Sequence, residues 1–350
     1  MKINKCIFAL IAGSVLLASC NGDDDSNAPL GSYDNGILVL NEGGSTGGAS
    51  VTYISDDLQT VQNDIFTAVN GDDVTLGLFP QSIFFSGDRA FIISNGSNRI
   101  TVVNRYTFEK VGEVTSGLTV PRYGVVYNGK AYVTNSNLFT SPTDDFIAVI
   151  DLNTLTAGTP IPVNNQAERI IEENGKLYVS GGFYGSGNVV SVINTSNQQV
   201  TAINVGTAPN SLEEKDGILY VLCSSWNGPG KIVRIRLSDN ALLGEMAFAE
   251  TMVNAQNLDI EDGFIYFTAG PKIYKVDPFL ALAADTPLID TGSESSYIGY
   301  GFAVNDGRIY IAEGADDFVS DGKIFIYSEN NGALVDEIPV GLGPNGFYFN

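Results

Sequence analysis

The chain has 350 residues, with 40 Asp and Glu against 18 Lys and Arg, a formal net charge of −22, and no histidine. An excess of negative charge of this size repels nucleic acids and anionic membrane surfaces, so neither is an expected partner. The lack of histidine excludes Ser-His and Cys-His catalytic arrangements and removes the commonest haem, zinc and copper ligand.

Residues 1–19 have the character of a secretory signal peptide. Lys2 and Lys5 form a short cationic start, and residues 6–19 are uncharged and apolar or small. This run is too short to span a bilayer as a permanent helix. Its ending, Leu17-Ala18-Ser19-Cys20, resembles the lipoprotein signal, which implies that Cys20 is acylated and becomes the mature N-terminus. The alternative is an ordinary cleaved signal followed by an incidental cysteine. An acylated Cys20 would be the only attachment to a membrane.

Residues 20–33 are polar and acidic, and they include Asp23-Asp24-Asp25. A segment of this composition cannot bury enough apolar surface to fold, so we expect a flexible tether. An acidic run after an acylated cysteine resembles the export signal of surface-exposed lipoproteins, which implies an outer-membrane protein facing the cell exterior. A plain spacer is the alternative. The run lacks the spaced ligands and closing Glu of a calcium loop, so no metal is expected here.

Residues 34–350 repeat one local pattern, in which two apolar runs flank a two-residue turn. Asn-Gly and Asp-Gly between apolar runs predict β-hairpins, because a type I′ turn needs a positive φ at both central residues. The seven pairs are Asn35-Gly36, Gly87-Asp88, Asn128-Gly129, Asn174-Gly175, Asp216-Gly217, Asp262-Gly263 and Asp306-Gly307.

A strand-like segment follows each turn, and a third and a fourth strand complete the unit, as in residues 177–179, 189–194 and 199–205. No segment shows a sustained 3.6-residue apolar period, so we expect almost no helix beyond one short turn at residues 279–284. The repeat predicts an all-β fold, a seven-bladed β-propeller of four-stranded antiparallel blades. The first unit lacks an inner strand, and Phe347-Tyr348-Phe349 matches one, so we expect the C-terminal strand to close the first blade.

The sequence contains only 3 cysteines. Cys6 would leave with the signal peptide and Cys20 would carry lipid, so Cys223 alone remains in the mature domain. No intramolecular disulfide is then possible. Cys223 ends a predicted strand, and we expect a packed thiol.

The repeat also carries a family resemblance. Tyr132-Val133-Thr134-Asn135 resembles the signature of the YVTN-type propeller repeat, and Leu177-Tyr178-Val179 and Leu219-Tyr220-Val221 keep its outline. The opening residues 35–43 look like the start of propeller lipoproteins found beside outer-membrane transporters. The resemblance covers residues 34–350. Its members include surface lipoproteins that capture corrinoids or iron–siderophore complexes, so it implies such a ligand and a TonB-dependent transporter as the partner.

Seven polar positions are expected to surround one mouth of the central channel, on the face where the variable loops gather. Counting back seven residues from the second residue of each turn gives Gln81, Arg122, Glu168, Asn210, Gln256 and Tyr300, and the C-terminal strand supplies Asn345. Their neighbours Tyr123, Arg169 and Asn257 join the candidate ligand-binding set. A ring of amides with one Arg and one Glu suits a large, polar, roughly neutral ligand. The alternative is that these side chains only solvate the channel and satisfy the ends of the inner strands.

The loops between second and third strands carry aromatic residues that strand packing cannot bury. Any one of them could anchor its own loop, whereas several on one face favour ligand binding. The candidates are Phe183, Tyr184, Trp226 and Phe318, with Tyr297 and Tyr300 from the segment before the last unit.

Together these features predict a non-catalytic, surface-exposed binding lipoprotein, without cofactor, that captures a large polar nutrient for an outer-membrane transporter. A corrinoid is the first candidate ligand. An iron–siderophore complex is the second, because many are anionic and Arg122 is the only basic residue of the ring. One alternative is a carboxylate- or calcium-based hydrolase or lyase, which requires acids such as Glu168, Glu313 and Asp316 to converge at the mouth. Another is a protein-interaction or adhesion module, which predicts a broad, flat apolar patch.

Overall fold

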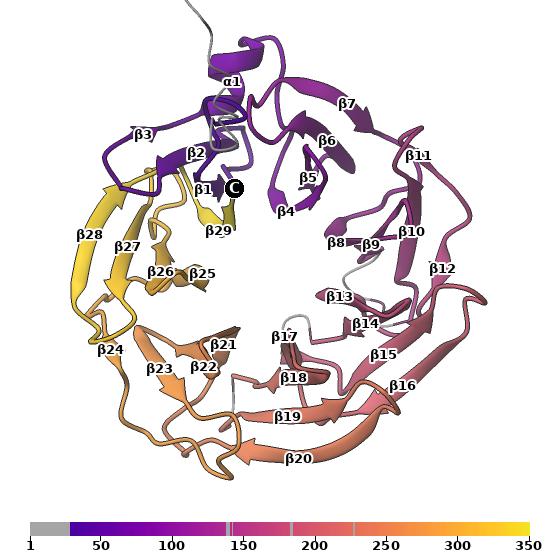
Figure 1. Ribbon diagram of the computed structural model, residues 1–350, viewed down its shortest axis with the longest axis vertical. Helices are drawn as coiled ribbons and strands as arrows, with labels where there is room; N and C mark the ends of the chain where they lie inside the picture. Colours follow the sequence, from indigo (N-terminus) through magenta and orange to yellow (C-terminus); the bar gives the residue numbers. More distant parts are fainter. Residues whose placement is uncertain (1–28, 138–140, 142, 183–184, 227) are drawn as a thin grey trace, which may run out of the picture.

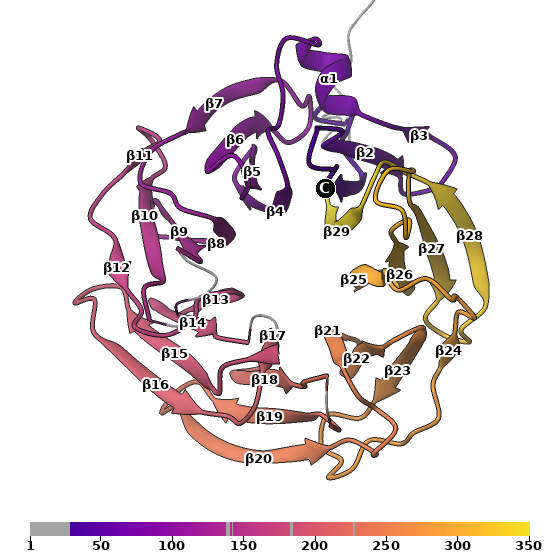
Figure 2. The same cartoon turned by 180° about the vertical axis from the view of Figure 1, so that it is seen from behind.

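The structure, a computed structural model, describes residues 29–137, 141, 143–182, 185–226 and 228–350. Its strands form seven antiparallel sheets arranged radially around a central opening (Figure 1, Figure 2). This confirms the predicted seven-bladed β-propeller. Among the described residues, no helix has both the length and the apolar character needed to cross a membrane.

The blades are numbered in chain order, and their strands are given from the channel outwards. Blade one contains β29 (Pro344–Phe349), β1 (Gly36–Asn41), β2 (Ser50–Ser55) and β3 (Val61–Gln62). Blade two contains β4 (Pro80–Ser86), β5 (Arg89–Ser94), β6 (Arg99–Asn104) and β7 (Lys110–Val114). Blade three contains β8 (Pro121–Tyr127), β9 (Lys130–Asn135), β10 (Phe146–Asp151) and two short outer strands, β11 (Thr156–Ala157) and β12 (Ile161–Pro162).

The remaining four blades follow the same order. Blade four contains β13 (Ile170–Glu173), β14 (Lys176–Ser180), β15 (Val189–Asn194) and β16 (Val200–Asn204). Blade five contains β17 (Pro209–Lys215), β18 (Ile218–Cys223), β19 (Lys231–Arg236) and β20 (Ala241–Ala247). Blade six contains β21 (Ala255–Glu261), β22 (Phe264–Ala269), β23 (Lys272–Val276) and β24 (Ile289–Asp290). Blade seven contains β25 (Ile298–Asn305), β26 (Arg308–Glu313), β27 (Lys323–Ser328) and β28 (Leu334–Pro339).

The C-terminal strand closes the ring, as predicted. β29 pairs antiparallel with β1, so that Phe349 lies opposite Ile37 and Phe347 lies opposite Val39. The side chain of Asn350 also donates hydrogen bonds to the carbonyls of Tyr33 at 2.7 Å and Arg105 at 2.9 Å. Because the two ends of the chain share one blade, the ring has no open sheet edge between its first and last units.

The hairpin turns have the expected backbone conformation in five blades. There, both central residues have positive φ, as a type I′ turn requires, at Asn128-Gly129, Asn174-Gly175, Asp216-Gly217, Asp262-Gly263 and Asp306-Gly307. In Gly87-Asp88 only the glycine has positive φ, which is the pattern of a type II′ turn. The interpretation of Asn35-Gly36 as a hairpin turn is wrong, because Gly36 begins β1 and the strand inside it comes from the other end of the chain.

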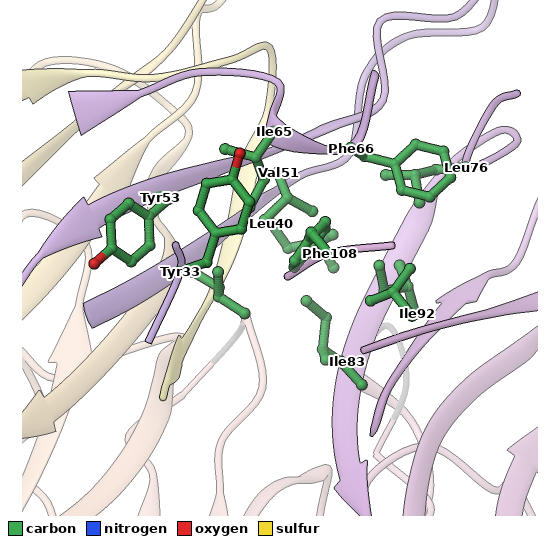
Figure 3. Close-up of a cluster of buried hydrophobic side chains, with 13 residues drawn as sticks. Tyr33, Leu40, Val51, Tyr53, Ile65, Phe66, Leu76, Ile83, Ile92 and Phe108 are labelled. Carbon is green, nitrogen blue, oxygen red and sulfur yellow. The ribbon is translucent and has the colours of Figure 1, made fainter. Parts of the chain in front are cut away.

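The hydrophobic core consists of clusters between neighbouring blades. Figure 3 shows the one shared by blades one and two, where Phe108 lies between Leu40 and Val51 on one side and Ile83 and Ile92 on the other, and Tyr33 packs edge-on against Phe108. The repeated tyrosine of the second strand contributes to this packing. Tyr178 donates to Asn240 of the next blade at 2.9 Å, and Tyr266 donates to Glu329 of the next blade. The tyrosine that marks the repeat in the sequence therefore ties one blade to the next.

A short helix and a buried cysteine are the remaining local features of the fold. Within the described ranges, one short α-helix, α1 (Ile65–Asn70), lies between β3 and β4, and the side chain of Asp64 accepts from the Thr67 amide at its start. With 6 residues it makes fewer than two turns, which is too short for a 3.6-residue apolar period to be visible in the sequence. The packed thiol is confirmed: Cys223 is 2% exposed, and burial raises its pKa to about 12.

Candidate functional site at the channel mouth

The mouth face is defined here as the end of the disc that carries the loops leading into the inner strands and the loops joining second to third strands. Both kinds of loop lie at the same end because the strands alternate in direction. The residues predicted for the ring lie at or near the starts of the inner strands β4, β8, β13, β17, β21, β25 and β29. The inner strands surround the central opening (Figure 1).

Most of these polar side chains bond to the next blade along the chain. The cross-blade bonds join Asn345 to the Pro80 carbonyl (2.8 Å), Gln81 to the Tyr123 hydroxyl (2.9 Å), Arg122 to the Glu168 carboxylate (2.8 and 2.9 Å), Asn210 to the Ala255 carbonyl (2.9 Å), Asn257 to the Gly299 carbonyl (2.7 Å) and Tyr300 to the Glu42 carboxylate. Gln256 differs, since it donates to Asn254 within its own blade at 3.2 Å. These bonds give the ring a structural role between blades, and its role in ligand binding stays a prediction.

The strongest of these contacts is the ion pair between Arg122 and Glu168. Arg122 donates through Nε and Nη2 to the two carboxylate oxygens, and the side chains are only 9% and 10% exposed. The backbone on both sides is also held, because Ser82 donates to the Arg122 carbonyl and Thr134 donates to the Glu168 carbonyl. A bidentate pair in this setting fixes the geometry of both groups and cancels their charges.

Arg169 and Tyr123 form a further contact of the polar ring. The guanidinium of Arg169 lies over the ring of Tyr123, 4.1 Å from its centroid, and Tyr123 also accepts from Gln81. Gln81 accepts in turn from Asn95 at 3.0 Å. Arg169 and Tyr123 thus form a cation–π pair beside the channel. The hydrogen bond from Gln81 to the Tyr123 hydroxyl fixes the position of that ring.

Two amide oxygens of the ring have no hydrogen-bond partner among the described residues. They are the buried Oδ1 atoms of Asn210 and Asn345. A buried acceptor without a partner is costly, so such positions favour a water or a ligand that carries a hydrogen-bond donor. Both atoms lie beneath the surface of the mouth, where a small buried water is the partner that fits them.

Three of the predicted aromatic residues gather at the rim, between blades seven and one. Tyr297 lies 4.4 Å from Phe318 and 6.3 Å from Tyr300, measured between ring centroids. Together with Glu42 and Leu342 they line an apolar cleft of about 20 Å³. Phe318 is 56% exposed and adopts a φ of 53°, a left-handed conformation that is unusual for an aromatic residue. The cluster thus presents apolar surface beside the channel mouth.

Of the remaining aromatic candidates, the structure describes Trp226, on blade five. Trp226 is 60% exposed, and a Cβ placed on Gly185 would lie 4.0 Å from its ring, so the two loops are neighbours. Phe183 and Tyr184 lie outside the described residues, as do Cys20 and most of the acidic tether. The exposed indole ring of Trp226 is therefore a surface that another molecule can contact.

Each of the acids named for a catalytic alternative is engaged by a neighbouring side chain in the structure. Glu168 is paired with Arg122, Glu313 accepts from Ser293 and lies 3.6 Å from Lys323, and Asp316 accepts from Ser295. Within the described ranges, no group of three His, Cys, Asp or Glu side chains is placed to hold a metal ion.

Sequence reasoning missed three acids. Glu42 accepts from Tyr300, and burial raises its pKa. Glu213 and Asp259 lie on the neighbouring inner strands β17 and β21, and burial raises both pKa values. The negative charge of Asp259 raises the pKa of Glu213 further, and Arg169 opposes that shift. An acid inside a strand-like run, as in Ser211-Leu212-Glu213 and Leu258-Asp259-Ile260, was the available signal.

The fold and the mouth define a seven-bladed β-propeller with a polar, cross-bonded ring and an aromatic rim. The chain belongs to the family described as "Domain of unknown function (DUF5074)", whose model matches residues 35–349. No protein with a curated description matches the sequence significantly.

Solved structures similar to this chain share its fold at low sequence identity. Hydrazine synthase of Kuenenia stuttgartiensis has a TM-score of 0.58 at 16% identity, covering 76% of this chain and 88% of that one. Dihydro-heme d1 dehydrogenase NirN, in complex with DHE, has a TM-score of 0.55 at 14% identity, covering 91% and 76%. Apo AztD from Citrobacter koseri has a TM-score of 0.54 at 12% identity, covering 89% and 96%. At these identities the likeness concerns the fold alone.

Proposed function

We propose that this protein is a non-catalytic binding protein that captures a large polar ligand on the mouth face. The observation that carries the proposal is the gathering of exposed aromatic residues around a polar ring, with Phe318 and Trp226 56% and 60% exposed. Aromatic surface supplies affinity, and the polar side chains around the mouth supply hydrogen bonds that orient a ligand. The proposal is supported by the pairing of Glu168 with Arg122, which occupies an acid that a hydrolase would need free.

The ligand proposed first is a corrinoid, and an iron–siderophore complex is proposed second. Both are large enough to span a ring mouth and to touch aromatic residues on separate blades. The pairing of Arg122 with Glu168 leaves the ring without net charge from these two residues, which suits a roughly neutral ligand better than an anionic one. The proposed setting is an outer-membrane lipoprotein anchored through Cys20, which passes its ligand to a TonB-dependent transporter.

The test is a calorimetric titration of purified residues 21–350 with cobalamin, with iron–siderophores and with haem. We expect a Kd below roughly 10 μM, about −7 kcal/mol, for at least one of them. The substitutions Trp226→Ala and Phe318→Ala should each weaken binding about tenfold or more, since aromatic hot-spot contacts are worth about 2 kcal/mol or more and about 1.4 kcal/mol is a factor of ten.

The matched control is Phe279→Ala. Phe279 is 69% exposed, but it lies between β23 and β24, in the outer part of blade six. It should leave the affinity unchanged. Absence of binding to all three compounds would contradict the proposed ligands, and equal losses for Phe318→Ala and Phe279→Ala would contradict the proposed face.

A further inference from the structure

A second cavity lies on the other face of the disc, where the hairpin ends of blades three and four meet. Its volume is about 300 Å³. The turn at Asn128-Gly129 and the turn after β15 form its edges, and both lie at the strand ends opposite to the mouth face. A cavity of this size is at the lower end of the range for small-molecule sites, which is about 300–1,000 Å³.

In two other blades, an arginine at the start of the second strand crosses the equivalent space to the next blade. Arg89 begins β5 and donates to the Leu152 carbonyl of the next blade at 2.7 Å. Arg308 begins β26 and donates to the Asp56 carbonyl of the next blade at 2.6 Å. In both cases the acceptor is the residue that directly follows the third strand.

Lys130 occupies the same position at the start of β9, and Thr195 is the equivalent of the acceptor in blade four. Within the part of the chain that the structure describes, Lys130 forms neither a hydrogen bond nor an ion pair with blade four. Lysine carries a compact ammonium group in place of the arginine guanidinium. The cavity lies beside this position, and the Tyr132 hydroxyl bonds to Thr195 across the two blades.

The lining has the chemistry of a sugar site. It combines the half-buried ring of Tyr127 with amide, hydroxyl and ammonium groups from Asn128, Lys130, Asn174 and Ser196, while Tyr132 at its base is only 5% exposed. Amides and hydroxyls both donate and accept hydrogen bonds, as sugar hydroxyls do, and tyrosine rings can contact the C–H face of a sugar. No carboxylate belongs to this lining, which disfavours a cation.

Gly175 keeps one of these groups accessible. A Cβ at this position would lie 3.0 Å from the Tyr127 hydroxyl oxygen, and the glycine has a φ of 77° in the hairpin turn. Any side chain here would therefore crowd the Tyr127 hydroxyl, which the glycine leaves free to face the cavity.

We propose that this cavity is a binding site for a neutral saccharide unit of hexose size. The ring of the sugar packs against a tyrosine, and its hydroxyls bond to the amide and hydroxyl groups of blade four and to Lys130. The site is separate from the mouth, so the proposal stands or falls independently of the function proposed above.

The experiment is saturation-transfer NMR on the folded protein with glucose, galactose, mannose and N-acetylglucosamine, each tested alone. Concentrations of roughly 50 mM saturate even a ligand with a Kd of about 1 mM. Two variants test the site. Ser196→Tyr fills the cavity from an exposed turn, and Lys130→Arg introduces the arginine that crosses the equivalent space in blades two and seven.

The matched control is Asn153→Tyr. Asn153 holds the position of Ser196 in blade three, since the backbone amide of each donates at 2.9 Å to the residue that ends the third strand. We expect at least one sugar to bind to the wild type and to Asn153→Tyr, with the signal lost in Ser196→Tyr and reduced at least tenfold in Lys130→Arg. The proposal is overturned if no sugar binds, if Ser196→Tyr still binds, or if Asn153→Tyr loses the signal as well.

Discussion

Arg122 and Glu168 stand at equivalent positions in neighbouring blades, and the structure turns them into partners. Each is a charged residue at the start of an inner strand, where an unpaired charge would be poorly solvated. The sequence indicated that both lie at the mouth, but it gave no sign that they bond to each other, because they are 46 residues apart. They lie side by side because they occupy equivalent positions in consecutive repeats, and consecutive repeats form neighbouring blades.

At the scale of this residue pair, removing one partner should be more harmful than removing both. Arg122→Met leaves the carboxylate of Glu168 buried without its counter-charge, and we expect the free energy of unfolding to fall by about 3–5 kcal/mol. The double variant Arg122→Met/Glu168→Met should recover much of that loss. Urea denaturation of the wild type, both single variants and the double variant provides the cycle; single variants within about 0.5 kcal/mol of the wild type would contradict it.

At the scale of the element, the inner strands carry acids in places where strands are usually apolar. Burial raises the pKa of Glu213 on β17 and of Asp259 on β21. Asp259 is held by the backbone amides of Ile260 and Val304, both at 2.7 Å, and Val304 belongs to the next blade. The acid on β21 therefore also acts as a link between inner strands.

These raised pKa values predict how stability changes with pH. A carboxyl whose pKa is higher in the folded state binds its proton more tightly there, so its stabilising effect is complete below the ordinary carboxyl pKa and is lost as the pH rises through the raised value. We expect the free energy of unfolding to decrease between about pH 5 and about pH 8, and Glu213→Gln to reduce this decrease by roughly 1 kcal/mol or more.

Denaturant unfolding at several pH values measures this effect. Glu250→Gln is the control, because Glu250 is exposed and its loss should leave the pH dependence unchanged. A wild-type protein that gains stability over this pH range would show that the inner-strand acids do not behave as described.

At the scale of the whole molecule, stability depends on closure by the C-terminal strand. β29 supplies the inner strand of blade one, and Phe347 is 8% exposed, with its ring 5.6 Å from that of Tyr310 in blade seven. Asn350 accepts from Arg105 of blade two at 2.7 Å. One short segment therefore contacts three blades.

Deleting residues 344–350 should open the ring. We expect the loss in unfolding free energy to exceed about 3–5 kcal/mol, the usual cost of emptying one buried phenylalanine site, since the deletion also removes a strand. Thermal and urea denaturation measure the loss, and a synthetic peptide of residues 341–350 should restore part of it. Equal stability of the shortened chain would mean that closure contributes little.

The Asn-Gly and Asp-Gly pairs, the alternating strands and the C-terminal Phe-Tyr-Phe segment determined the propeller, because turn conformation and strand period depend on residues close together in the chain. They also placed the ring and the aromatic rim on one face. The tertiary structure alone decided which of these side chains are already bonded to one another. Tyr300 and Glu42 are 258 residues apart, and no local pattern encodes their contact. The cavity between blades three and four was equally hidden, since its lining comes from two blades and forms only when they pack together.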